Sequence, residues 1–186
     1  MTLLRTTRLE LAPFSPQDVD ELLPLFNDPE VGRYLLDGAV VSREWVEEEV
    51  RESRRRFAGG GAGLWTVRAR HVGGGRRDVG EGEVEWTGRE LLGIVGYRPF
   101  FDPPELQLLY ALKPTSWGQG IASEAATAAI GHAFDALGFH EVRAATDTPN
   151  SASIRVLERL GMTLWKTEPG DPWDTLFYRI PSSSWR

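Results

Sequence analysis

The sequence predicts a mixed α/β domain, and two stretches carry that prediction. Residues 105–112 suit a strand, residues 117–120 form a glycine-bearing turn, and residues 122–137 repeat apolar side chains at helical spacing. Residues 91–98 are almost wholly apolar, which is typical of a strand buried on both faces of a sheet. Because 186 residues suffice for one well-filled core, no domain boundary is expected.

The N-terminal part is expected to combine a short strand with two helices. Residues 7–13 alternate well enough for the strand, and Ser15 followed by Pro16 is a typical helix start. Ser42 is expected to cap a second helix over residues 43–57, whose acidic residues come first and basic residues last, as the helix dipole favours. The arginines at its end are interpreted as a solvated helix face rather than a nucleic-acid contact.

The rest of the chain alternates strands with glycine-rich connections. Residues 64–70 suit a strand, and the glycine-rich residues 71–90 are expected to form an insertion or extended hairpin. A further strand, a short helix and a closing hairpin are expected over residues 141–146, 151–160, 162–166 and 175–180.

Composition argues against several classes of protein. A net charge of −6 disfavours duplex nucleic acid as a partner and suits a cationic small molecule or a protonated amine. The chain has no cysteine, which excludes disulfides, thiolate metal sites and an acyl-cysteine intermediate, and its three histidines do not cluster, so no metal is expected. With no signal peptide and no apolar run of about 20 residues, we expect a cytoplasmic protein without a membrane partner.

The turn at residues 117–120 has two interpretations on spacing alone. A strand, a glycine loop and a helix N-terminus present converging N–H groups that can bind phosphate. The same glycines could serve only to make a tight turn, because a single glycine pair is a weak signal. No Gly-Lys-Ser/Thr ending follows, which argues against a P-loop that transfers phosphate.

A longer string around this turn narrows the choice. It reads Tyr110-x-Leu112-x-Pro114-x-x-Trp117-Gly118-x-Gly120-x-Ala122-Ser123-Glu124-Ala125. It closely resembles the acetyl-CoA loop of the GCN5-related N-acetyltransferases (GNAT), specifically the branch typified by ribosomal-protein alanine acetyltransferases. The segments at residues 27–34 and 150–162 are similar to the same branch. The resemblance implies one N-acetyltransferase domain over residues 1–186, with a mixed, mostly antiparallel central sheet and helices on both faces.

The resemblance also implies acetyl-CoA as co-substrate, with the loop backbone holding its pyrophosphate and a backbone N–H near residues 110–112 as oxyanion donor. In that family the residue matching Asn150 contacts the pantetheine arm and the one matching Ser153 lies near the thiol. From the residues alone, Asn150 is also a helix cap, and Trp117 either shields the pantetheine channel or only packs. The expected cofactor-binding residues are Tyr110, Ala111, Leu112, Trp117, Gly118, Gln119, Gly120, Ile121, Ala122, Ser123, Asn150 and Ser153.

The proton transfers are less clearly marked. Many relatives carry glutamate where this chain has Gln107, and because an amide cannot take a proton, Gln107 is interpreted as positioning the acceptor. Glu105 lies two residues earlier on the same strand face, so it is either the general base, directly or through water, or a solvated strand-end carboxylate. Leu157 replaces the tyrosine that many other acetyltransferases use as acid. Ser153 or water then protonates the thiolate, or the thiolate leaves unprotonated.

The predicted function is acetyl transfer from acetyl-CoA to a primary amine by direct attack. The acceptor is either a protein N-terminus or a small amine, contacted by Arg33, Tyr34 and Gln107, and the resemblance is compatible with a homodimer. One alternative is a catalytically weak acetyl-CoA-binding regulatory module, which the replacements at Gln107 and Leu157 favour. A generic nucleotide-binding domain is the other.

Overall fold

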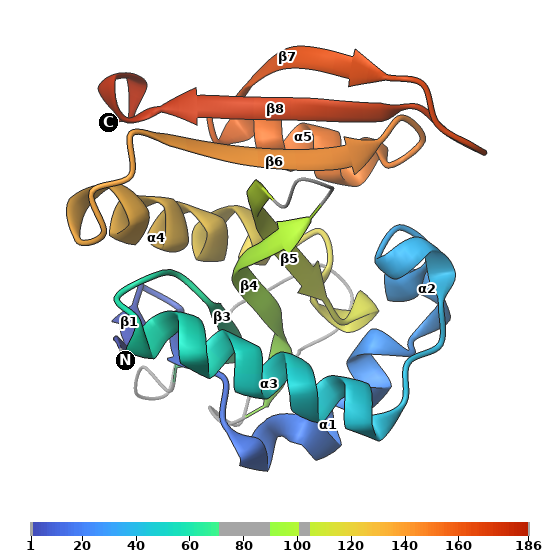
Figure 1. Ribbon diagram of the computed structural model, residues 1–186, viewed down its shortest axis with the longest axis vertical. Helices are drawn as coiled ribbons and strands as arrows, with labels where there is room; N and C mark the ends of the chain where they lie inside the picture. Colours follow the sequence, from blue (N-terminus) through green and yellow to red (C-terminus); the bar gives the residue numbers. More distant parts are fainter. Residues whose placement is uncertain (1, 71–89, 101–104, 186) are drawn as a thin grey trace.

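A computed structural model of the protein describes residues 2–70, 90–100 and 105–185, without the side chains of Asp37 and Glu105. It confirms the predicted mixed α/β class, with antiparallel ladders and helices packed on them (Figure 1). The first sheet, in spatial order, consists of β1 (Leu4–Arg5), β2 (Leu9–Pro13), β3 (Leu64–Ala69), β4 (Leu91–Phe100) and β5 (Glu105–Leu112). The second consists of β6 (Glu141–Asp147), β8 (Thr175–Pro181) and β7 (Thr163–Glu168). The α-helices are α1 (Val19–Phe26), α2 (Pro29–Gly32), α3 (Arg43–Ala58), α4 (Ile121–Asp135) and α5 (Ser151–Arg159).

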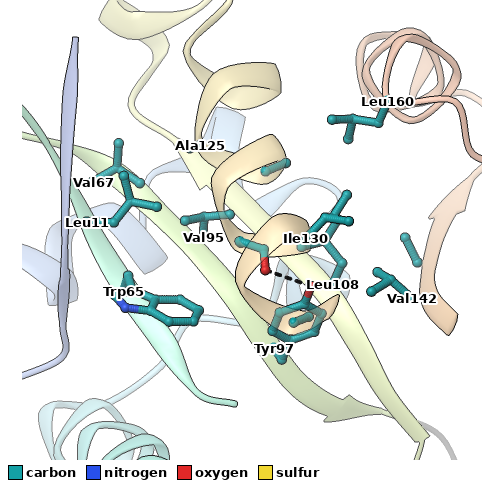
Figure 2. Packing of buried hydrophobic residues seen from close by; sticks show 14 of the residues in the cluster. Leu11, Trp65, Val67, Val95, Tyr97, Leu108, Ala125, Ile130, Val142 and Leu160 are labelled. Atoms are coloured by element: carbon teal, nitrogen blue, oxygen red, sulfur yellow. Dashed lines mark hydrogen bonds between the residues drawn. The ribbon is translucent and has the colours of Figure 1, made fainter. Parts of the chain in front are cut away.

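The first sheet is buried on both faces. One face packs against α4, whose small side chains at Ala125 and Ala129 let the helix lie close to the strands (Figure 2). Within this layer the Tyr97 hydroxyl donates a hydrogen bond to the Ala129 carbonyl at 3.3 Å. The other face packs against α1 and α3 through a second apolar cluster, which includes Leu22 and Val50. The prediction that residues 91–98 form a strand buried on both faces is therefore confirmed.

The two sheets meet at β5 and β6. These strands lie side by side, yet no ladder joins them, so the one central sheet expected from the sequence is interrupted between them. Their facing edges carry backbone N–H and C=O groups that no ladder uses. Such groups can pair with an extended ligand in the way that an added strand pairs with a sheet edge.

Most predicted elements are present, and the differences are local. The helix expected after Ser15 begins with a 3₁₀ turn, Pro16–Asp18, in which the Asp18 carboxylate accepts the Ser15 backbone N–H at 2.8 Å. The strand expected over residues 7–13 begins at Leu9 and pairs with β1, which was not predicted. The insertion expected at residues 71–90 falls almost wholly outside the described residues. None of the described helices combines the length and the apolar character that crossing a membrane requires.

Candidate active site

The loop between β5 and α4 has the backbone that its glycines predict. Gly118 and Gly120 have φ of +73° and +74°, in the left-handed region that glycine adopts without strain. A Cβ on Gly118 would have no heavy atom within 4 Å, so space is open beside the loop. Trp117 braces the loop through its indole Nε1, which donates to the Leu112 carbonyl at 2.8 Å. The loop leads directly into α4. The first N–H groups of that helix have no intrahelical acceptors, so they are available to bind an anion.

The N-terminal strand region reaches this loop through Glu124, in the first turn of α4. Its carboxylate accepts hydrogen bonds from the Thr6 hydroxyl at 2.5 Å, from the Arg8 backbone N–H at 2.9 Å and from Arg8 Nε at 2.5 Å. Burial alone would raise the pKa of Glu124, but the hydrogen bonds from Thr6 and Arg8 outweigh it and lower that pKa below its usual value. Glu124 is therefore ionised at neutral pH.

Tyr110 spans the interval between β5 and the start of α5. Its hydroxyl lies 2.7 Å from Ser153 Oγ and donates to the Ser153 carbonyl at 3.2 Å. Asn150 caps the helix by accepting the Ser153 backbone N–H at 3.1 Å. Burial raises the pKa of Tyr110 to about 12, against the lowering effect of its bond to Ser153. The structure thus brings together three residues that the sequence assigned separately to the cofactor.

A cleft of about 100 Å³ lies at the same junction of β5 and β6. It is lined by Tyr34, Leu35, Leu36, Phe100, Gln107, Leu108, Leu109 and Ala145. The predicted acceptor residues Tyr34 and Gln107 therefore meet in one cleft. Arg33 does not line it; its guanidinium lies over the Tyr34 ring, 5.3 Å from the centroid. Trp173, near the start of β8, packs against Tyr34 with ring centroids 5.5 Å apart.

The structure also limits what several predicted site residues can do. Ile121, Ala111 and Leu112 are buried, so they can reach a cofactor only through their backbone. Leu157 is buried in the core cluster, and no hydroxyl replaces the missing tyrosine at that position. The backbone of Glu105 pairs with Phe100, but its side chain lies outside the description. Its role as general base stays a prediction.

Two buried hydroxyls lack a hydrogen-bond partner within the described residues. Ser123 Oγ lies in the first turn of α4 and Thr146 Oγ1 lies in β6. Buried hydroxyls normally have a partner, which for Ser123 a ligand at the start of α4 could supply. Across residues 2–70, 90–100 and 105–185, no group of three or more metal-ligating side chains is present.

Comparison with known proteins identifies the family. The model of the family described as an acetyltransferase (GNAT) domain matches residues 8–163. The chain belongs to the GNAT acetyltransferase family. The resemblance seen in the loop string is thereby confirmed, and with it the class of acyltransferases that use acetyl-CoA.

Relatives and solved structures resemble this chain over most of its length. It is 32% identical to the uncharacterised protein YkkB of Bacillus subtilis over 171 residues, covering 89% of this chain and 88% of that one. It is 30% identical to the FsC-acetyl coenzyme A-N(2)-transacetylase of Aspergillus fumigatus over 167 residues, covering 86% of this chain and 64% of that one. The structure of RimL, a ribosomal L7/L12 α-N-protein acetyltransferase in complex with coenzyme A, superposes with a TM-score of 0.75 at 19% identity, covering 97% of this chain and 98% of that one. At that identity the likeness concerns the fold.

Proposed function

We propose that this GNAT protein transfers the acetyl group of acetyl-CoA to a primary amine by direct attack, the acceptor being a small amine or a protein N-terminus. The observation that carries the proposal is the convergence at one gap. The Tyr110–Ser153 pair and the cleft lined by Gln107 border the interval between β5 and β6, and the glycine loop follows the end of β5 in the chain. Acetyl-CoA supplies a thioester, whose carbonyl carbon accepts the amine and whose thiolate departs.

The backbone provides two of the groups that the transfer needs. The amides of residues 118–123 hold the pyrophosphate at the start of α4, where the helix dipole favours negative charge. An N–H on the free edge of β5, among residues 110–112, donates to the carbonyl oxygen as charge develops on it. Both roles use backbone groups, which is in keeping with the burial of Ala111 and Leu112.

Side chains on the two sides of the gap have the remaining roles, which are positioning of the acceptor, transfer of protons and binding of the pantetheine arm. Gln107 positions the acceptor in the cleft, and Glu105 removes the ammonium proton directly or through a water. On the other side, Asn150 holds the pantetheine arm, and the thiolate either takes a proton that water supplies through Ser153 or directly, or leaves unprotonated. The phenol of Tyr110 carries one proton, which it can donate either to the Ser153 carbonyl or to Ser153 Oγ. When the proton goes to Oγ, the Ser153 proton is free to face the sulfur.

Replacing Tyr110 by phenylalanine tests whether its hydrogen bond to Ser153 contributes to catalysis. Loss of one hydrogen bond of roughly 0.5–1.5 kcal/mol should lower kcat by about 2- to 10-fold. Because the pKa of Tyr110 is about 12, the phenol stays protonated between about pH 6 and 9, so the ratio of wild-type to variant rates should be constant there. Tyr97→Phe is the matched control, since its phenol also bonds a carbonyl but lies inside the core. Equal rate losses in the two variants would contradict the assignment.

Asn150→Ser separates capping from cofactor binding. Serine caps a helix nearly as well as asparagine, so the melting temperature should stay close to that of the wild type. If Asn150 also holds the pantetheine arm, kcat/KM for acetyl-CoA should fall while stability does not. Steady-state kinetics and a thermal melt on the same preparations give both quantities. An unaltered kcat/KM would leave the cap as the sole role.

Release of free thiol from acetyl-CoA against a panel of amines and N-terminal peptides tests the function itself. The proposal expects acceptor-dependent thiol release with at least one class. Binding of acetyl-CoA without turnover on any acceptor would favour a regulatory module. The presence of Gln107 and Leu157, in place of the glutamate and tyrosine that many relatives carry, is consistent with that alternative. No binding at all would remove both interpretations.

A further inference from the structure

Arg8 lies beside the phosphate loop although no sequence motif marks it. Its guanidinium is held at two of its three nitrogens: Nε donates to Glu124 at 2.5 Å, and Nη1 donates to the Gln119 carbonyl at 2.9 Å. The third nitrogen, Nη2, would lie 3.5 Å from a Cβ built on Gly120. Within the described residues Nη2 has no hydrogen-bond acceptor. A fixed guanidinium thus presents a donor at the glycine where the loop meets α4.

The charges around this donor account for its placement. Glu124 is ionised and stands in the first turn of α4, where its negative charge alone would oppose the approach of a phosphate. Arg8 offsets that charge through direct contact. The two side chains are only 29% and 19% exposed, so their interactions are less screened by water than those of a surface pair.

Arginine suits a phosphate contact of this kind. Its planar guanidinium presents several donors in a fixed geometry, and one whose orientation is already set loses little entropy when it binds an anion. The bonds to Glu124 and Gln119 set that orientation before any ligand arrives. A purely structural salt bridge between the N-terminal strands and α4 would explain the bond to Glu124. It would not explain why the remaining donor faces the loop glycine.

We propose that Arg8 is a phosphate-binding residue of this protein, donating from Nη2 to a phosphate group of acetyl-CoA, and that Glu124 is the positioning residue that aims it. The inference rests on the proposed function, because it needs acetyl-CoA at the loop. The ligand chemistry is a phosphate oxygen, which either the pyrophosphate or the 3′-phosphate of the cofactor provides.

Arg8→Gln is the variant that tests the contact, with Arg5→Gln as matched control. Arg5 carries the same charge on the neighbouring strand β1 but pairs with Glu10 on the surface. Isothermal titration with acetyl-CoA should show a Kd at least about tenfold higher for Arg8→Gln and little change for Arg5→Gln, because a hydrogen bond to a charged group is lost only in the first. Thiol release with acetyl-pantetheine, which has no phosphate, should be equal in all three proteins.

Titration with acetyl-dephospho-CoA distinguishes the two phosphate sources. A tenfold loss that persists with this ligand assigns the contact to the pyrophosphate, and a loss that vanishes assigns it to the 3′-phosphate. Arg8→Lys covers the case in which Arg8→Gln does not fold. Its single ammonium keeps the charge but cannot reproduce three directed donors, so a higher Kd is expected at a melting temperature near the wild type.

Three outcomes would overturn the inference. They are an unchanged acetyl-CoA Kd in folded Arg8→Gln, an equal loss in Arg5→Gln, and a matching loss of acetyl-pantetheine turnover, which would indicate a distorted loop. Failure of the proposed function looks different, because the wild-type protein itself would then not bind acetyl-CoA.

Discussion

Glu105→Gln is expected to lower kcat/KM by roughly 10²-fold near neutral pH, the lower end of general-base effects. An amine acceptor is mostly ammonium at that pH, and only its free base can attack a thioester. Gln107 lies in the cleft but cannot accept a proton, so Glu105, two residues earlier on β5, is the proposed base. Steady-state rates at saturating acetyl-CoA and varied acceptor measure the loss.

The pH profile of Glu105→Gln should identify the missing step. Raising the pH should recover part of the activity, because more acceptor then arrives already deprotonated. Gln107→Glu in the same background should restore activity by returning a carboxylate to the cleft, where burial raises its pKa and suits it to proton transfer. A Glu105→Gln enzyme with the wild-type rate between about pH 6 and 9 would defeat the proposal, and the acceptor would have to lose its proton before binding.

Gly120→Asp should weaken acetyl-CoA binding by at least about tenfold. The substitution places a negative charge where the phosphates approach the backbone, and its Cβ would lie 3.5 Å from Arg8 Nη2. A side chain at φ +74° is strained, but aspartate tolerates the left-handed region better than most residues, so the variant should fold. Calorimetric titration measures the affinity and a thermal melt reports the fold.

Gly120→Asn is the control for Gly120→Asp. Asparagine has nearly the same shape and the same tolerance of the left-handed region, but it carries no charge. It should therefore weaken binding less than aspartate does. Unchanged acetyl-CoA affinity in folded Gly120→Asp would show that the loop is not the phosphate site.

Local features of this fold could be predicted from the sequence because short-range physics determines them. The left-handed glycines at 118 and 120, the cap at Asn150 and the buried strand β4 each follow from a few neighbouring residues. The start of α1 was less predictable, since a 3₁₀ turn over Pro16–Asp18 precedes the α-helix. Competing turn geometries of similar energy decide such boundaries.

The side-chain contacts of the site could not be predicted in the same way. Arg8 reaches Glu124 across 116 residues, and Tyr110 reaches Ser153 across 43, so neither pair leaves a spacing signal. Tyr110 was expected at the cofactor only by resemblance, and its bond to the Ser153 hydroxyl appears only in the fold. Arg8 was missed altogether. The alternating segment in which it was expected looks like any other strand, and its proposed role depends on where the sheet places α4.

The most direct test of the account is a single-turnover reaction with isotopically labelled acetyl-CoA, quenched over time and read by mass spectrometry of both protein and acceptor. Direct attack at the gap between β5 and β6 predicts that label appears on the acceptor amine as thiol is released, while the protein remains unlabelled at every time. A labelled protein that forms first and then passes its acetyl group to the acceptor would contradict the account, as would thiol release without a labelled acceptor.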